Sequence, residues 1–185
     1  MTLFALPLAA AFALIYTGIW RPSGSTEHGD LIHPARPLPQ LSLHDELGNS
    51  VASEFLQQKW SLVYVGDGQC DDRCRAALAD MQRARELLGK DMTRVQLVFF
   101  ASGHCCDLQV LRATHQNLII GRVDDELGAP LLETFPHYDA VAPANAGRIY
   151  IVDPHANLMM SYRSGASGIG MYQDLKKLLD LSHIG

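Results

Sequence analysis

The sequence predicts an α/β domain in which helices flank a mixed β-sheet, preceded by an N-terminal transmembrane helix. The chain has 185 residues, enough for one ordinary domain and not comfortably for two. Short apolar runs rich in β-forming residues alternate with segments of helical periodicity, which is the order that builds α/β sheets. The charged fraction of 19% is low beside a hydrophobic fraction of 48%, so part of the chain is apolar for a reason other than a core.

The N-terminal apolar stretch, residues 3–20, contains no charged residue (LFALPLAAAFALIYTGIW). It just reaches the length of about 20 residues that a helix needs to cross a bilayer. Tyr16 and Trp20 lie near its end, where aromatic rings prefer the membrane interface. A cleaved signal peptide would show a basic segment and a small-x-small cleavage site, and neither precedes Arg21. We therefore expect an uncleaved anchor at residues 1–21, although its flanking charges do not favour an outward-facing domain.

Residues 22–38 are predicted as a linker, because they are rich in proline and show no apolar periodicity. The remaining residues, 39–185, have the size of one domain. Its first element is a β-hairpin at 40–52, in which apolar and polar residues alternate around a turn at Gly48 and Asn49.

A short helix is expected at 53–58, followed by a strand at 60–65 (WSLVYV), whose continuous apolar run is typical of burial on both faces. A helix is predicted from Cys70 to about Leu88, since apolar residues recur there at helical spacing and Gly89 ends the pattern. The segments predicted after it are strand 95–100, helical turn 107–113, strand 118–123, helix 126–135, loop 136–147, strands 148–152 and 157–162, and helix 171–181. This order, a hairpin, then βαβαβα, then ββα, predicts a thioredoxin-like fold.

The charge balance and the motifs exclude several classes of protein. The chain carries 15 basic and 20 acidic residues, a net charge of −5, without the basic excess or stripe of a nucleic-acid-binding protein. It has no phosphate-binding glycine loop, no His-Glu-x-x-His and no Gly-x-Ser-x-Gly motif. Four cysteines in 185 residues are too few for a small disulfide scaffold.

Cys70 and Cys74 carry the strongest chemical signal, at the start of a predicted helix that directly follows a buried strand. Their spacing places both sulfurs on one helix face, close enough to chelate a soft metal ion or, with rearrangement of the first turn, to form a disulfide. The helix N-terminus favours the thiolate, whereas Asp71 and Asp72 oppose it, so we expect no very low thiol pKa. The alternative is two ordinary cysteines, with Cys74 as a small apolar residue of the buried stripe. The strand–turn–helix junction favours the functional interpretation.

The segment 59–81, KWSLVYVGDGQCDDRCRAALADM, resembles the signature of the Sco/SenC family. The likeness extends to the anchor, the linker, the segment around RIYIVDPHANLMMSY and the C-terminal DLKKLLDLSHIG, and is closest to small Sco-like proteins associated with oxidase assembly in proteobacteria. The resemblance implies a thioredoxin-like domain anchored in the bacterial inner membrane and facing the periplasm. It also implies a role in inserting copper into a cytochrome c oxidase subunit, alone or with other assembly factors. Cys70 and Cys74 would then be Cu(I) ligands, a thiol reductase pair, or both.

One position departs from the family pattern. Sco proteins supply a third copper ligand, a histidine a few residues before the strand that ends here at Asp153 and Pro154, and the matching position holds Asn145. An amide is a poor ligand for soft copper, so only the two cysteines are carried over as copper ligands. Gly147 stands near the place of the proline that usually precedes this strand in thioredoxin-like proteins.

Other residues were weighed as substitute ligands. His104, Cys105 and Cys106 follow the second predicted strand, at the sheet edge expected for Cys70, and are more simply loop residues. His137 could swing toward the cysteines, whereas His155 lies on the far side of a strand. The linker histidines, His28 and His33, are interpreted as polar linker residues.

Three functions remain open. The first is a Sco-like assembly factor that acts through Cys70 and Cys74, with Cys70 as the more exposed nucleophile. The second is a general periplasmic thiol–disulfide oxidoreductase of the TlpA type, although such enzymes place two residues between their cysteines and this chain places three. The third is a non-catalytic scaffold that has kept the fold and lost the site, for which Asn145 is the main argument.

Overall fold

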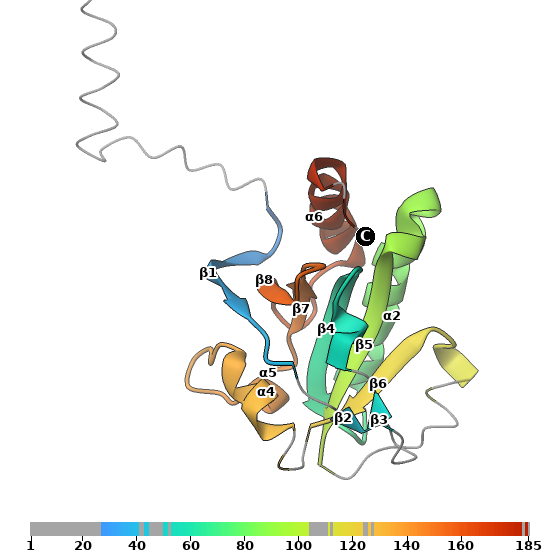
Figure 1. Cartoon of the computed structure of the whole chain (residues 1–185). Coiled ribbons are helices and arrows are strands. Elements are labelled where there is room, and N and C mark those ends of the chain that lie inside the picture. Colours follow the sequence, from blue (N-terminus) through green and yellow to red (C-terminus); the bar gives the residue numbers. More distant parts are fainter. Residues whose placement is uncertain are drawn as a thin grey trace, which may run out of the picture.

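One eight-stranded mixed sheet organises the domain (Figure 1). The computed structural model describes residues 27–40, 43–44, 50–51, 53–103, 111, 113–123, 126, 128–182 and 184. The strands are β1 (Asp30–Pro37), β2 (Leu43–His44), β3 (Ser50–Val51), β4 (Trp60–Asp67), β5 (Val95–Ser102), β6 (Leu118–Arg122), β7 (Ile149–Val152) and β8 (Asn157–Tyr162). Their order across the sheet is β1-β8-β7-β4-β5-β6-β2-β3.

The three central strands β4, β5 and β6 are parallel, and every other neighbouring pair is antiparallel. The predicted strands after residue 60 are all present. The predicted hairpin is confirmed as the pair β2–β3, with Leu43 opposite Val51, while its expected turn at Gly48 and Asn49 lies outside the described residues. The thioredoxin-like mixed sheet expected from the sequence is therefore confirmed.

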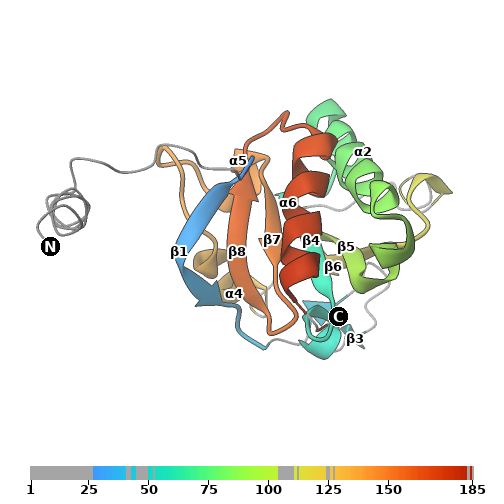
Figure 2. The same cartoon turned by 90° about the horizontal axis from the view of Figure 1, so that it is seen from above.

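Two long helices, α2 (Asp72–Leu87) and α6 (Gly168–Leu181), cover one face of the sheet side by side (Figure 2). The short helix α4 (Ala129–Thr134) contributes Leu131 to the apolar cluster on the opposite face. Alternate residues of β4 supply both clusters: Leu62 and Tyr64 join the α2–α6 side, and Val63 and Val65 join the other. This explains why a buried central strand has an unbroken apolar sequence.

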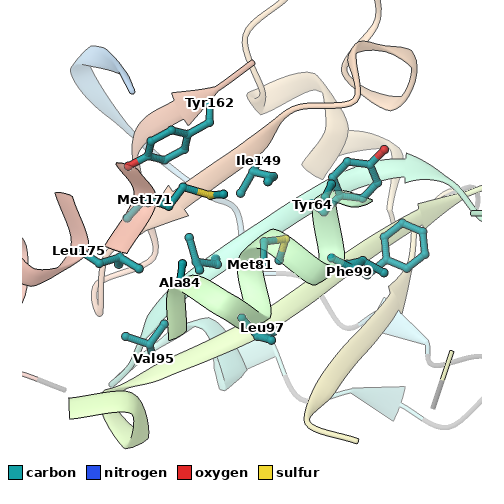
Figure 3. Packing of buried hydrophobic residues seen from close by; sticks show 14 of the residues in the cluster. Tyr64, Met81, Ala84, Val95, Leu97, Phe99, Ile149, Tyr162, Met171 and Leu175 are labelled. Atoms are coloured by element: carbon teal, nitrogen blue, oxygen red, sulfur yellow. The ribbon is translucent and has the colours of Figure 1, made fainter. Parts of the chain in front are cut away.

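The α2–α6 side of the core is drawn in Figure 3, which includes Met81 of α2 and Met171 of α6. Both methionine side chains are fully buried, and each such burial stabilises the fold by roughly 1.5–3 kcal/mol. Flexible thioethers suit a seam where two helices and a twisted sheet must be filled at once.

Residues 30–37, predicted as linker, form the edge strand β1, which pairs with β8 from Asp30 opposite Ser161 to Pro37 opposite Asn157. Nearly all of its side chains are exposed, so the strand has no apolar alternation for a sequence pattern to reveal. Its prolines are tolerated because an edge strand needs fewer ladder hydrogen bonds, and the register shifts between Leu31 and Arg36. Regular structure therefore begins before the predicted domain start at residue 39.

Other boundaries also differ from expectation. Helix α2 begins at Asp72 rather than at Cys70, and the predicted loop 136–147 contains a short helix, α5 (Pro143–Ala146). Helix α6 begins at Gly168 rather than at 171, because Ser167 caps it and its first turn is glycine-rich rather than apolar. The helix expected at 53–58 is the 3-10 turn η1 (Ser53–Leu56), and a second 3-10 turn, η2 (Gly89–Arg94), follows α2. The helical turn expected at 107–113 falls largely outside the described residues.

No helix within the described ranges is long and apolar enough to span a bilayer. The predicted anchor at residues 1–21 lies outside those ranges.

Candidate functional site

The candidate site lies where β4 ends and the chain turns into α2. Asp67 ends the strand, and its carboxylate accepts a hydrogen bond from the Gln69 backbone N–H at 2.7 Å, which forms a tight Asx turn. The Gly68 N–H donates to the Ser102 carbonyl at 2.8 Å and ties the turn to the end of β5. Cys70 follows with a positive φ of 47°, a left-handed conformation that is uncommon for a residue with a side chain.

Cys70 and Cys74 form a disulfide, with their Cα atoms 4.9 Å apart. The expectation that both belong to the helix is wrong for Cys70, which precedes it, because Asp71 caps α2 and redirects the chain. The Asp71 carboxylate accepts from the Cys74 backbone N–H at 2.9 Å, so Cys74 lies in the first turn. The Cys70 carbonyl accepts from the Arg75 guanidinium at 2.7 Å, which fixes the residue before the cap.

Both cysteines are nearly fully buried, with Cys70 4% and Cys74 1% exposed. Cys74 lines a cleft of about 160 Å³, which we call the cysteine cleft. Its lining residues are Tyr64, Asp67, Asp71, Arg73, Cys74, Ala144, Asn145 and Gly147. Cys70 was expected to be the more exposed nucleophile, but both cysteines are buried, and it is Cys74 that lines the cleft.

Asn145 is brought to this cleft by α5, so the position where Sco proteins carry histidine does lie beside the cysteines. Among the described residues, no group of three or more His, Cys, Asp or Glu side chains lies close enough together to hold a metal ion. His137 is exposed and does not line the cleft, and His155 lies in the turn between β7 and β8. His104, Cys105 and Cys106 lie outside the described residues, so their proposed ligand role stays a prediction.

Tyr64 is the aromatic wall of the cysteine cleft. Burial raises the pKa of its phenol above the ordinary value of 10.0, the Asp71 carboxylate raises it further, and the Arg73 guanidinium lowers it. The phenol therefore remains protonated at neutral pH and presents a neutral wall to the sulfurs. Figure 3 shows its ring at the end of β4, beside Phe99.

Tyr64 and Arg73 were not identified as site residues from the sequence. Tyr64 lies within an apolar strand run, where tyrosine is an ordinary β-forming residue, and Arg73 is one of several arginines on a helix. The only available signal was position: Tyr64 lies three residues before the end of β4, and Arg73 lies between the two cysteines.

The arrangement suits thiol–disulfide exchange. A disulfide at a helix N-terminus can be opened by an incoming thiolate, and the helix dipole stabilises the thiolate that leaves. The cleft admits a partner to Cys74, while burial protects the pair from indiscriminate attack.

The fold and the cysteine pair define a thioredoxin-like protein with a disulfide at the junction of its first central strand and helix. Residues 60–182 match the family model described as transmembrane-like, thioredoxin-like, C-terminal domain. The chain belongs to this family.

Individual proteins show the same relationship. A candidate copper-binding protein of Stutzerimonas stutzeri is 23% identical over 164 residues, which is 81% of this chain and 80% of that protein. The structure of Bradyrhizobium japonicum ScoI with copper bound is 18% identical, with a TM-score of 0.59 over 76% of this chain and 98% of that chain.

The structure of BsSco, described as having a disulfide switch and belonging to the Sco family of cytochrome c oxidase assembly proteins, is 15% identical. Its TM-score is 0.60 over 80% of this chain and 96% of that chain. The resemblance to Sco proteins found in the sequence is therefore confirmed at the level of the fold.

Proposed function

We propose that this chain is a membrane-anchored assembly factor for cytochrome c oxidase, acting through Cys70 and Cys74 as a thiol–disulfide reductase and Cu(I) carrier for the oxidase copper site. The observation that carries the proposal is the Cys70–Cys74 disulfide, held at the start of α2 with Cys74 lining a cleft. Support for the client comes from the Sco neighbours, one of which is described as a member of an oxidase assembly family.

In the reductase role, the reduced pair transfers two electrons to a client disulfide. One thiolate attacks a sulfur of the client disulfide, the other client sulfur leaves as a thiolate, and a mixed disulfide forms. The second thiolate then attacks the mixed disulfide, which releases the remaining client thiolate as the Cys70–Cys74 bond closes. In the closed pair the two Cα atoms lie 4.9 Å apart, and the Asp71 cap of the helix is formed. A second dithiol protein would return the pair to its reduced form by the same exchange.

In the carrier role, copper is the cargo. Two thiolates suit Cu(I), a soft ion that accepts two ligands. Asn145 lies at the cleft but offers only an amide, so the two cysteines would hold the ion without a third ligand from that position. We therefore expect weaker retention of copper than a site with a histidine would give, which favours release to a client.

We also propose that the domain faces the periplasm, held to the inner membrane by residues 1–21. Support comes from the uncharged stretch 3–20 and from the disulfide itself, since structural and catalytic disulfides persist mainly in oxidising compartments.

The test is a Cu(I) competition titration of the reduced full-length chain in detergent, beside the C70S/C74S double variant and the N145H variant. We expect equimolar binding that the double variant loses and that N145H strengthens by about tenfold or more, as a third soft-compatible ligand should. An intact chain that binds no Cu(I) would remove the carrier role and leave the reductase role.

The reductase role has its own measurement. A thiol–disulfide redox titration should give one two-electron transition that the double variant lacks. Turnover of a generic disulfide substrate would favour a TlpA-like oxidoreductase, and oxidase assembly supported by C70S/C74S in cells would leave only a scaffold.

A further inference from the structure

The cysteine cleft adjoins a second depression of about 350 Å³, because Arg73 and Asn145 line both. The second depression runs away from Cys74 toward β8 and the loop before α5. Three arginines, Arg73, Arg148 and Arg163, line it together with Tyr138 and a single carboxylate, Asp139. We call it the arginine cleft.

Arg148 is built into the floor of this cleft, only 6% exposed. Its guanidinium donates to the Asp30 carboxylate at 3.1 Å and to the Ser161 hydroxyl at 2.9 Å, and lies 3.5 Å over the Tyr138 ring. A guanidinium held on three sides keeps a fixed orientation, so the positive charge of the floor is preorganised.

The other two arginines, Arg73 and Arg163, are exposed, and their positive charges are not matched by an equal number of carboxylates. The Asp30 carboxylate forms an ion pair with Arg148 and also lies 3.7 Å from the Nε atom of Arg163, so one carboxylate faces two guanidiniums. The Arg163 side chain is 80% exposed. Within the described part of the chain, no carboxylate lies within ion-pair distance of Arg73.

The nearby carboxylates of Asp67 and Asp71 already accept hydrogen bonds from backbone N–H groups and line the cysteine cleft, not the arginine cleft. Asp139 lines the arginine cleft and Asp30 contacts both Arg148 and Arg163, so two carboxylates face three guanidiniums. The arginine cleft therefore carries excess positive charge on a chain whose net charge is −5.

We propose that the arginine cleft binds carboxylate side chains of an extended client segment, next to the client cysteine that reacts at the cysteine cleft. This proposal rests on the proposed thiol chemistry. It adds what the chain would recognise in its partner, namely a cysteine flanked by aspartate or glutamate. Guanidiniums in a fork geometry bind carboxylates well, and a contact beside the client sulfur would orient it for exchange.

The first test measures docking without chemistry. A fluorescent peptide with a central serine in place of cysteine, flanked by aspartates, is titrated with the full-length chain in detergent, beside the same peptide with asparagines. We expect the aspartate peptide to bind roughly three- to tenfold more tightly, with the advantage shrinking in 0.5 M salt, as screened surface contacts do. R73Q and R163Q should each reduce the preference, whereas R83Q, which removes an exposed charge elsewhere on α2, should leave it unchanged.

Equal binding of the two peptides, or an equal effect of R83Q, would overturn the proposal. So would full competition by inorganic phosphate at a matched concentration of charge, which would indicate a site for small anions rather than for a peptide.

The second test separates docking from reactivity. A cysteine peptide thiolate attacks the Cys70–Cys74 bond, which breaks as a bond to the peptide sulfur forms, and the displaced cysteine leaves as a thiolate. We expect the aspartate peptide to react faster than the asparagine peptide by the same factor as in binding, while 2-mercaptoethanol reacts equally with wild type and R163Q. If 2-mercaptoethanol reacts but the peptides do not differ, the docking proposal fails and the thiol chemistry stands. If neither thiol reacts but the binding preference remains, the thiol chemistry fails and the docking site stands.

Discussion

At the scale of single residues, Gly147 shows how tightly the residues that line the cysteine cleft are packed. It has a positive φ of 58° just after α5, a conformation that glycine adopts without strain. A Cβ atom there would lie 2.9 Å from the Arg73 Cδ atom and 3.7 Å from the Tyr64 hydroxyl oxygen. Gly147 stands near the place where thioredoxin-like proteins usually carry proline. The aliphatic part of the Arg73 side chain occupies the space that a side chain at position 147 would need.

We expect Gly147→Ala to destabilise the chain by about 1–3 kcal/mol, from left-handed strain plus displacement of Arg73. Gly89→Ala is the matched control, since Gly89 has the same φ of 58° but nothing within 4 Å of a Cβ. Denaturant unfolding should show the larger loss for G147A. Equal losses would mean that Arg73 moves aside without cost.

At the scale of elements, the first turn of α2 holds the site together. Asp71 caps the helix through the Cys74 N–H, while the neighbouring Asp72 is exposed and pairs with Arg75 on the surface. The cap therefore sets where the helix starts and so which cysteine lies inside it. Without it the first turn would fray, and the two cysteines of the reduced pair would no longer be held at a fixed spacing.

Asp71→Ala should lower the free energy of unfolding by about 0.5–2 kcal/mol, the usual cost of losing an N-cap side chain. Asp72→Ala, which removes the same charge from an exposed surface pair, should cost less than about 1 kcal/mol. Asn at position 71 should retain most of the stability. Thermal unfolding of the three oxidised variants compares them, and a D72A loss as large as that of D71A would contradict the capping role.

At the scale of the whole molecule, Asp174 on α6 binds the segment that precedes β1 and so ties it to the domain. Its carboxylate is 2% exposed and accepts from the Tyr162 hydroxyl at 2.9 Å and from the backbone N–H groups of His28 and Gly29 at 2.8 and 3.1 Å. The fit is close, since a Cβ on Gly170 would meet His28 at 2.9 Å. His28, predicted as a polar linker residue, is therefore a contact between the N-terminal segment and α6.

Asp174→Ala should cost about 2–4 kcal/mol, because three donors lose one buried acceptor. Tyr162→Phe should cost less, since it removes one donor and leaves the carboxylate its backbone partners. Amide hydrogen exchange should show β1 losing protection in D174A and largely keeping it in Y162F. Unchanged protection of β1 in D174A would show that pairing with β8 alone holds the strand.

The sequence by itself determined the central strands, the two long helices and the position of the cysteine pair, because buried strands and amphipathic helices leave periodic apolar patterns. The resemblance to Sco proteins implied that Asn145 stands at the place of their copper-binding histidine, and Asn145 lines the cysteine cleft with Cys74. Only the tertiary structure decided the rest. An exposed edge strand has no pattern of its own, so β1 is defined by its partner β8. The arginine cleft gathers Arg73 from α2, Arg148 from immediately before β7 and Arg163 from the segment after β8. Such groupings arise from chain packing across long sequence separations, which no local pattern encodes.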